Sequence, residues 1–186
     1  MQKGNELYVL SRLRLRFARR LPRVMNVLTV NLLLNTLIFW IVARLYLLPR
    51  LERVDPTTVL VPVLLLHSTR HLGLMFLASG ATHPGIPAQF SYPAAFGDLV
   101  AAVFALVALF AVKRNLRSAR AAVWVFNVAG TLDLLLAITL ATIYDAQPYM
   151  GAAYWIPAFW VPALLVTHAV TFVILSKPWP RVTKAA

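Results

Sequence analysis

Several ionisable side chains interrupt the apolar runs of this 186-residue sequence. His67, Arg70 and His71 lie near the middle of VLLLHSTRHLGLMF. Asp98 stands in SYPAAFGDLV, and Asp133 stands in FNVAGTLDLLLA. In a segment that crosses a bilayer such groups are costly, and they commonly mark ion pathways, substrate sites or proton relays. We therefore take these five residues as the first candidates for chemistry.

Counting helical residues from the ends of the apolar runs places most of these groups in a common layer. At a rise of about 1.5 Å per residue, Arg70, Asp98 and Asp133 fall within a few ångströms of the segment midpoints, on one side, together with His71. An arginine beside carboxylates is tolerable in a low dielectric because the charges offset one another. The layer therefore predicts that Arg70 pairs with Asp98 or Asp133.

Three chemistries fit this set of side chains. His67 and His71 are four residues apart, so on an α-helix both rings project from one face and could share a metal ion. Asp98, Asp133 or His168 would complete the ligand set. In the second chemistry, His168 and one of the other two histidines ligate a haem from different helices. The third is movement of a proton or another ion along the buried side chains.

A fourth interpretation gives the cluster no chemistry. Arg70 and the two aspartates would tie three helices together, while Asn127 and Thr167 form hydrogen bonds across helix interfaces. The histidine pair argues against a purely structural role, because an unpaired buried imidazole N–H costs about 1–3 kcal/mol. We therefore expect His67 and His71 to face the interior, beside a cavity, and Asn127 and His168 to lie at one level.

Composition identifies the elements that must position these residues. Hydrophobic residues make up 60% of the chain and charged residues 13%, with a mean hydropathy of +0.73. A soluble domain carries roughly 45–50% apolar and about 25% charged residues. Five apolar segments are each long enough to cross a bilayer as a helix, which takes roughly 20 residues. We predict spans over residues 25–47, 58–79, 91–112, 121–144 and 152–175.

The predicted fold is all-α, an integral membrane bundle of five transmembrane helices over residues 25–176. Its connections are short, so neighbouring helices are expected to be antiparallel. Residues 1–24 are basic, and apolar side chains three or four positions apart share one face, which predicts an amphipathic helix on the membrane surface. Residues 177–186 form a basic tail. The chain has no cysteine, which excludes disulfides, thiolate catalysis and Cys-ligated metals.

The net charge of +12, from 18 Lys and Arg against 6 Asp and Glu, lies mainly outside the apolar segments. This placement favours contact with the lipid bilayer and its anionic headgroups and argues against nucleic acid as a partner. The loops at 80–90 and 145–151 contain no Lys or Arg, which predicts that both are periplasmic. The basic N-terminus conflicts with this orientation, unless the first segment does not fully cross.

Two stretches, FNVAGTLDLLLA and GAAYWIPAFWVPALLVTH, resemble parts of small, uncharacterised multi-pass membrane proteins of bacteria. The resemblance covers the second to fifth segments and implies a helical fold in a bacterial inner membrane, without an activity, a cofactor or a residue role. The leading functional hypothesis is binding or passage of a small solute, proton or ion through the buried cluster. The alternatives are a membrane-embedded metal- or haem-dependent enzyme and a structural or accessory subunit; a homo-oligomer is also expected.

Overall fold

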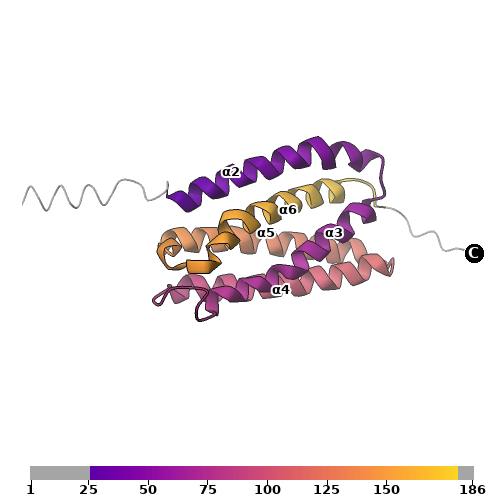
Figure 1. Ribbon diagram of the computed structural model, residues 1–186. Coiled ribbons are helices and arrows are strands. Elements are labelled where there is room, and N and C mark those ends of the chain that lie inside the picture. The colour runs from indigo at the N-terminus through magenta and orange to yellow at the C-terminus, as the bar shows by residue number, and fades with distance from the viewer. Residues whose placement is uncertain (1–25, 180–186) are drawn as a thin grey trace, which may run out of the picture.

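The computed structural model describes residues 26–179, and over that range the chain is helical, with no strand. Five long helical segments lie side by side in an elongated bundle (Figure 1). Each is long and apolar enough to cross a membrane, and they run Val27–Leu51, Pro56–Leu77, Ala88–Lys113, Ala119–Ile143 and Gly151–Ser176. The prediction of an all-α fold with five such helices is confirmed. The predicted interfacial helix at 1–24 lies outside the described residues.

Three of the five segments change their winding along their length, whereas the third and fourth are α-helical throughout. In chain order the elements are α2 (Val27–Val42), the π-helix η1 (Ala43–Leu47), the 3₁₀-helix η2 (Leu48–Glu52), α3 (Pro56–Ser68), the 3₁₀-helix η3 (Thr69–Leu77), α4 (Ala88–Lys113), α5 (Ala119–Ile143), the 3₁₀ turns η4 (Gln147–Tyr149) and η5 (Gly151–Tyr154), the π-helix η6 (Ile156–Trp160) and α6 (Val161–Ser176). These changes decide which side chains face the interior.

Local sequence determines where α2 and α3 begin. The side chain of Asn26 accepts a hydrogen bond from the Thr29 amide at 2.8 Å, which caps the first turn of α2. Asp55 caps α3 in the same way, accepting from the Thr57 amide at 2.8 Å. Pro56 then occupies the first helical position, where its missing N–H leaves no helical hydrogen bond unmade.

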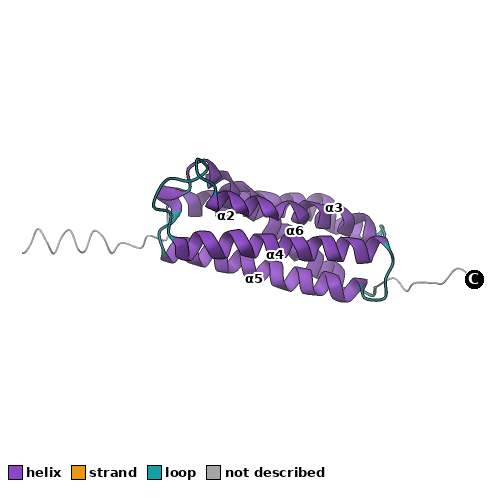
Figure 2. Cartoon of the chain, turned by 90° about the horizontal axis from the view of Figure 1, so that it is seen from below, coloured by secondary structure: helices purple, strands orange, loops and turns teal. Residues whose placement is uncertain are grey.

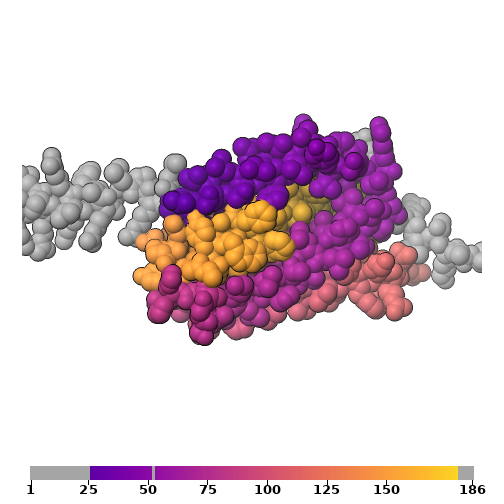
Figure 3. Space-filling model, in the orientation of Figure 1, coloured from indigo at the N-terminus to yellow at the C-terminus, as the bar shows by residue number. Residues whose placement is uncertain are grey.

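The segments from α3 to α6 form most of a shared core, and α2 packs against α6 and η6 and contributes Leu28 to that core. The space-filling view shows α2 along one side of the bundle, with α6 beneath it and next to α3 (Figure 3). Buried alanines on α4, among them Ala101, Ala105 and Ala108, let neighbouring helices approach closely. Large apolar side chains such as Leu106 and Leu132 are exposed along the outside.

The apolar core consists of two clusters. One includes Leu60, Ala105 and Phe126, and the other includes Phe76 and Leu134. Along the second, third and fourth segments, Arg70, Asp98 and Asp133 each lie between residues of one cluster and residues of the other. The candidate site is therefore a polar layer within an apolar bundle.

The two ends of the bundle differ in charge. Loops gather at both ends (Figure 2), but the loops around 80–87 and 145–150 contain no Lys or Arg. A hydrogen bond from His83 N to Tyr149 O at 2.8 Å joins these two loops, and one from Ala153 N of η5 to Ala81 O at 3.0 Å joins the first loop to η5. Apart from the buried Arg70, the Lys and Arg side chains of residues 26–179 lie toward the opposite end: Arg44, Arg50, Arg53, Lys113, Arg114, Arg117, Arg120 and Lys177.

Candidate functional site

The 3₁₀ winding of η3 presents Arg70 to the core. In a 3₁₀-helix, side chains three residues apart share one face. The buried residues of this stretch follow that period, since His67, Arg70, Gly73 and Phe76 are all buried. His71 lies off this face and is exposed, with its Nδ1 3.1 Å from the carbonyl oxygen of Ser68 one turn earlier in the chain. The expectation that both histidines face the interior is therefore right for His67 and wrong for His71.

The Arg70 guanidinium is fully buried and contacts partners on three other helices. Its Nε donates to Asp98 Oδ1 on α4 at 2.7 Å, and its Nη2 donates to Asp133 Oδ2 on α5 at 2.5 Å. Its Nη1 donates to the Gly130 carbonyl at 3.1 Å and lies 3.4 Å from His168 Nε2 on α6. The predicted pairing is confirmed, and Arg70 pairs with both aspartates rather than one.

Three glycines leave the space that this cluster fills. A Cβ atom at Gly130 would lie 2.7 Å from His168 Cε1 and 2.8 Å from Arg70 Nη1. Cβ atoms at Gly73 and Gly97 would overlap the two carboxylates that Arg70 binds. Sequence reasoning missed these glycines, although glycine inside a helix is disfavoured by about 1 kcal/mol relative to alanine and so signals a packing requirement.

His168 and Asn127 lie at one level of the bundle, as predicted, and they are hydrogen-bonded to each other. His168 Nδ1 lies 2.7 Å from Asn127 Oδ1, and Asn127 Nδ2 donates to the His168 carbonyl at 3.3 Å. Because an amide oxygen only accepts, the His168 proton sits on Nδ1. The Nε2 lone pair then faces Arg70, and the imidazole is neutral.

His67 packs against His168 but is hydrogen-bonded elsewhere. The two ring centroids are 4.2 Å apart, and the His67 ring also meets Phe126 edge-on at 5.0 Å. His67 Nε2 lies 2.9 Å from Thr167 Oγ1, a hydroxyl that donates to the Ala163 carbonyl at 2.9 Å. Since that hydroxyl has one proton, His67 Nε2 is the donor and Nδ1 is bare. Nδ1 is buried without a hydrogen-bond partner among the described residues.

The residues present do not fit either metal hypothesis. The shared-ion hypothesis needs His67 and His71 on one face, but the winding changes from α to 3₁₀ at Thr69 and separates them. Within residues 26–179, no group of three or more His, Asp or Glu side chains is arranged to hold a metal ion. The haem hypothesis needs His168 and its partner on opposite faces of a macrocycle, whereas the His67 and His168 rings are in contact.

A family model described as Domain of unknown function (DUF8737) matches residues 27–176 of the chain. The chain belongs to this family. The matched region of this DUF8737 protein contains all five long helices and every member of the Arg70 cluster. No curated protein matches the chain, and no solved structure matches it.

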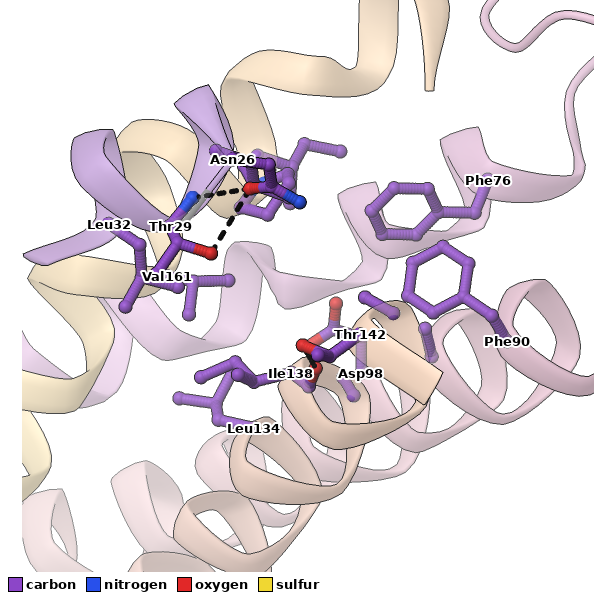
Figure 4. A pocket seen from close by; sticks show the side chains of 16 residues that line it. Asn26, Thr29, Leu32, Phe76, Phe90, Asp98, Leu134, Ile138, Thr142 and Val161 are labelled. Carbon is purple, nitrogen blue, oxygen red and sulfur yellow. Dashed lines mark hydrogen bonds between the residues drawn. The ribbon is translucent and has the colours of Figure 1, made fainter. Parts of the chain in front are cut away.

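A cavity of about 130 Å³ lies beside the cluster in this DUF8737 protein (Figure 4). It is lined by residues of α2, η3, α4, α5, η6 and α6, and its walls are mainly apolar. The polar residues that line it are Asn26, Thr29, Asp98 and Thr142. Neither His67 nor His71 lines it, so the expectation that this cavity reaches a histidine is wrong. Asp98 makes the connection between cavity and cluster instead.

Each carboxylate bound to Arg70 keeps one oxygen without a hydrogen-bond donor. Within the described chain, Asp98 Oδ2 and Asp133 Oδ1 accept no hydrogen bond, while the other oxygen of each is held by Arg70. Asp98 lines the internal cavity, whereas Asp133 lines a groove on the outer surface between α4 and α5. The cluster therefore reaches an internal space on one side and the surface of the bundle on the other.

Proposed function

We propose that this chain is a multi-pass integral protein of the bacterial inner membrane that binds either a small cationic solute or a proton at the Arg70 cluster. Five helices of sufficient length and hydropathy support the membrane location, as do the large apolar side chains on the outside. The basic end of the bundle suits the anionic headgroups of the cytoplasmic leaflet. The loops without Lys or Arg then face the periplasm.

The charge of the cluster carries the functional part of the proposal. One guanidinium faces the carboxylates of Asp98 and Asp133, and the hydrogen bonds of His67 and His168 leave both rings neutral. One positive and two negative charges leave a net charge of −1. A net charge in a low-dielectric interior is unfavourable, so uptake of one proton or one cationic solute stabilises the cluster.

A purely structural cluster does not need this arrangement. A tie between η3, α4 and α5 would be neutral with one carboxylate and one carboxamide, and every Arg70 hydrogen bond would be kept. The second carboxylate adds only an unbalanced charge. Both carboxylates also keep one oxygen that no described residue satisfies, which leaves positions where a proton or a solute can bind.

Infrared spectroscopy of the protein in lipid nanodiscs tests the proposal. Acidification from neutral pH is expected to produce one protonated-carboxyl band from the buried pair. Asp98→Asn and Asp133→Asn each bring the net charge to zero, so either substitution alone is expected to abolish that band. Asp55→Asn is the matched control, because it replaces an exposed carboxylate while keeping the cap of α3. If the band remains in each of the two single variants, Asp98→Asn and Asp133→Asn, the proposal is wrong.

A further inference from the structure

We propose that the cavity beside Asp98 binds a small organic ammonium ion, a primary amine that carries one aromatic ring or one short alkyl chain. This inference rests on the proposed function and names the class of its solute. The geometry points to it through three properties of the cavity. These are its size, the carboxylate of Asp98 in its lining and the two phenyl rings in its lining.

The cavity limits the ligand to a small molecule. Its volume is about 130 Å³. An apolar protein cavity of about 150 Å³ takes up one benzene molecule. Most of the lining side chains are apolar, among them Leu28, Leu32, Leu134, Ile138, Ile156 and Val161. A ring or a chain of about six carbons therefore fits, and burying it removes apolar surface from water.

The free oxygen of Asp98 determines the charge of the ligand. The Asp98 side chain is nine-tenths buried, and Arg70 fixes its orientation through Oδ1. Its Oδ2 accepts no hydrogen bond within the described chain, although Asp98 lines the cavity. An ammonium N–H donated to this oxygen forms a charge-assisted hydrogen bond. The net charge of −1 at the cluster favours a cation there and disfavours an anion.

Two phenyl rings add a second feature suited to a cation. Phe76 of η3 and Phe90 of α4 both line the cavity and meet edge to face, with ring centroids 5.1 Å apart. Figure 4 shows both rings on one side of the cavity, across from Asn26 and Thr29. The faces of aromatic rings attract ammonium groups, and the attraction grows when the site is desolvated. These rings would also stack with an aromatic ligand.

Protonation of Asp98 would compete with the ammonium ion for the same oxygen. The groups that face Asp98 are Arg70 of η3, Asp133 of α5 and, through Arg70, His168 of α6. Described residues of α2 that line the cavity carry no charge. Proton and amine therefore neutralise the same excess charge, and binding of the amine is expected to release the proton. Amine binding is therefore coupled to proton release.

Binding of two amines and their matched alcohols to nanodisc-embedded protein tests the inference. The probes are benzylamine with benzyl alcohol and n-hexylamine with n-hexanol, measured by saturation-transfer NMR against empty nanodiscs. At neutral pH, at least one amine is expected to bind about tenfold more tightly than its alcohol, the factor that one charge-assisted hydrogen bond supplies. Asp98→Asn keeps the acceptor for Arg70 but turns a donor toward the cavity, so it is expected to remove that preference.

The variants separate this inference from the proposed function. Ala94→Leu, or Ala137→Leu if the first variant does not fold, fills the cavity and leaves the carboxylates in place. Either is expected to abolish amine binding while the infrared band of the carboxyl pair remains. His71→Leu, on the outer surface, is expected to change neither measurement. If neither amine is preferred over its alcohol, or if Asp98→Asn leaves the preference intact, the inference is wrong even where the infrared band is present.

Discussion

The side-chain amide of Asn35 donates a 2.8 Å hydrogen bond to the carbonyl oxygen of Ala158. This carbonyl lies four residues before Pro162, which has no N–H to donate to it. Asn35 on α2 thus supplies the donor that α6 itself lacks, next to the π-helix η6. Besides this bond, α2 is linked to the fifth segment by a 3.2 Å hydrogen bond from Asn31 to the Tyr154 hydroxyl. Most of α2 is otherwise exposed, so these two hydrogen bonds help to hold α2 against the fifth segment.

We predict that Asn35→Leu destabilises the protein and that the effect depends on Pro162. The substitution leaves the buried Ala158 carbonyl without a donor, which costs about 1–3 kcal/mol. In a Pro162→Ala background the helix regains an N–H, so the same substitution is expected to cost clearly less. Thermal unfolding of the two single variants and the double variant in detergent measures this coupling. Equal losses in both backgrounds would show that Asn35 acts independently of Pro162.

Sequence reasoning succeeded where a physical constraint left few choices. Apolar runs of more than 20 residues predict spanning helices by length alone. The pairing of Arg70 with the aspartates followed in the same way, because helices in a bilayer share depth and an unpaired buried charge is costly. Both inferences needed only distance along a helix. Neither needed the packing between helices.

The same reasoning failed where winding or packing decides the outcome. His71 was placed with His67 on the assumption of α-helical spacing, but the 3₁₀ winding from Thr69 onward turns it outward. A glycine inside a helix signals a packing requirement, but the sequence does not identify Arg70 and His168 as the side chains for which Gly130 leaves room. The cavity beside Asp98 is likewise a product of how the helices pack, with no local sequence signal.

We predict that Arg70→Met strongly destabilises the protein and that neutralising its partners reverses much of the loss. The single substitution leaves the carboxylates of Asp98 and Asp133 buried without a cation, at a cost of about 3–5 kcal/mol. The triple variant Arg70→Met, Asp98→Asn, Asp133→Asn removes those charges and is expected to unfold at a higher temperature than Arg70→Met. Arg117→Met, at an exposed position, is the control. No recovery in the triple variant would mean that the ion pairs are not the source of the loss.

Gly130→Ala is expected to destabilise the protein, against the usual direction. In a helix interior, alanine is more stable than glycine by roughly 0.5–1 kcal/mol. At this position the added methyl would lie 2.7 Å from His168 and 2.8 Å from Arg70. Overpacking of this kind costs about 1–3 kcal/mol and should displace the guanidinium from its partners. A thermal unfolding curve shifted to higher temperature would show that the cluster has more space than these distances allow.

The hydrogen bonds also predict opposite tautomers for the two buried histidines. His168 donates from Nδ1 to Asn127, whereas His67 donates from Nε2 to Thr167. Solid-state NMR of ¹⁵N-histidine-labelled protein distinguishes the two neutral tautomers and the imidazolium ion. In a variant with His71→Leu and His83→Leu, both at exposed positions, one ring of each tautomer is expected at neutral pH. An imidazolium signal would contradict the net charge of −1 on which the proposed function depends.

Orientation in the membrane is the remaining prediction, and two parts of the sequence disagree about it. The loops at one end of the bundle lack Lys and Arg, which favours the periplasm, whereas the basic residues before position 25 favour the cytoplasm for the same end. We expect the loops to prevail, because the opposite end gathers basic side chains from three separate segments. His83→Cys is therefore expected to react with an impermeant thiol reagent in intact spheroplasts, and Arg117→Cys only after permeabilisation. Both positions are exposed and the chain has no other cysteine, so the reverse pattern would invert the topology.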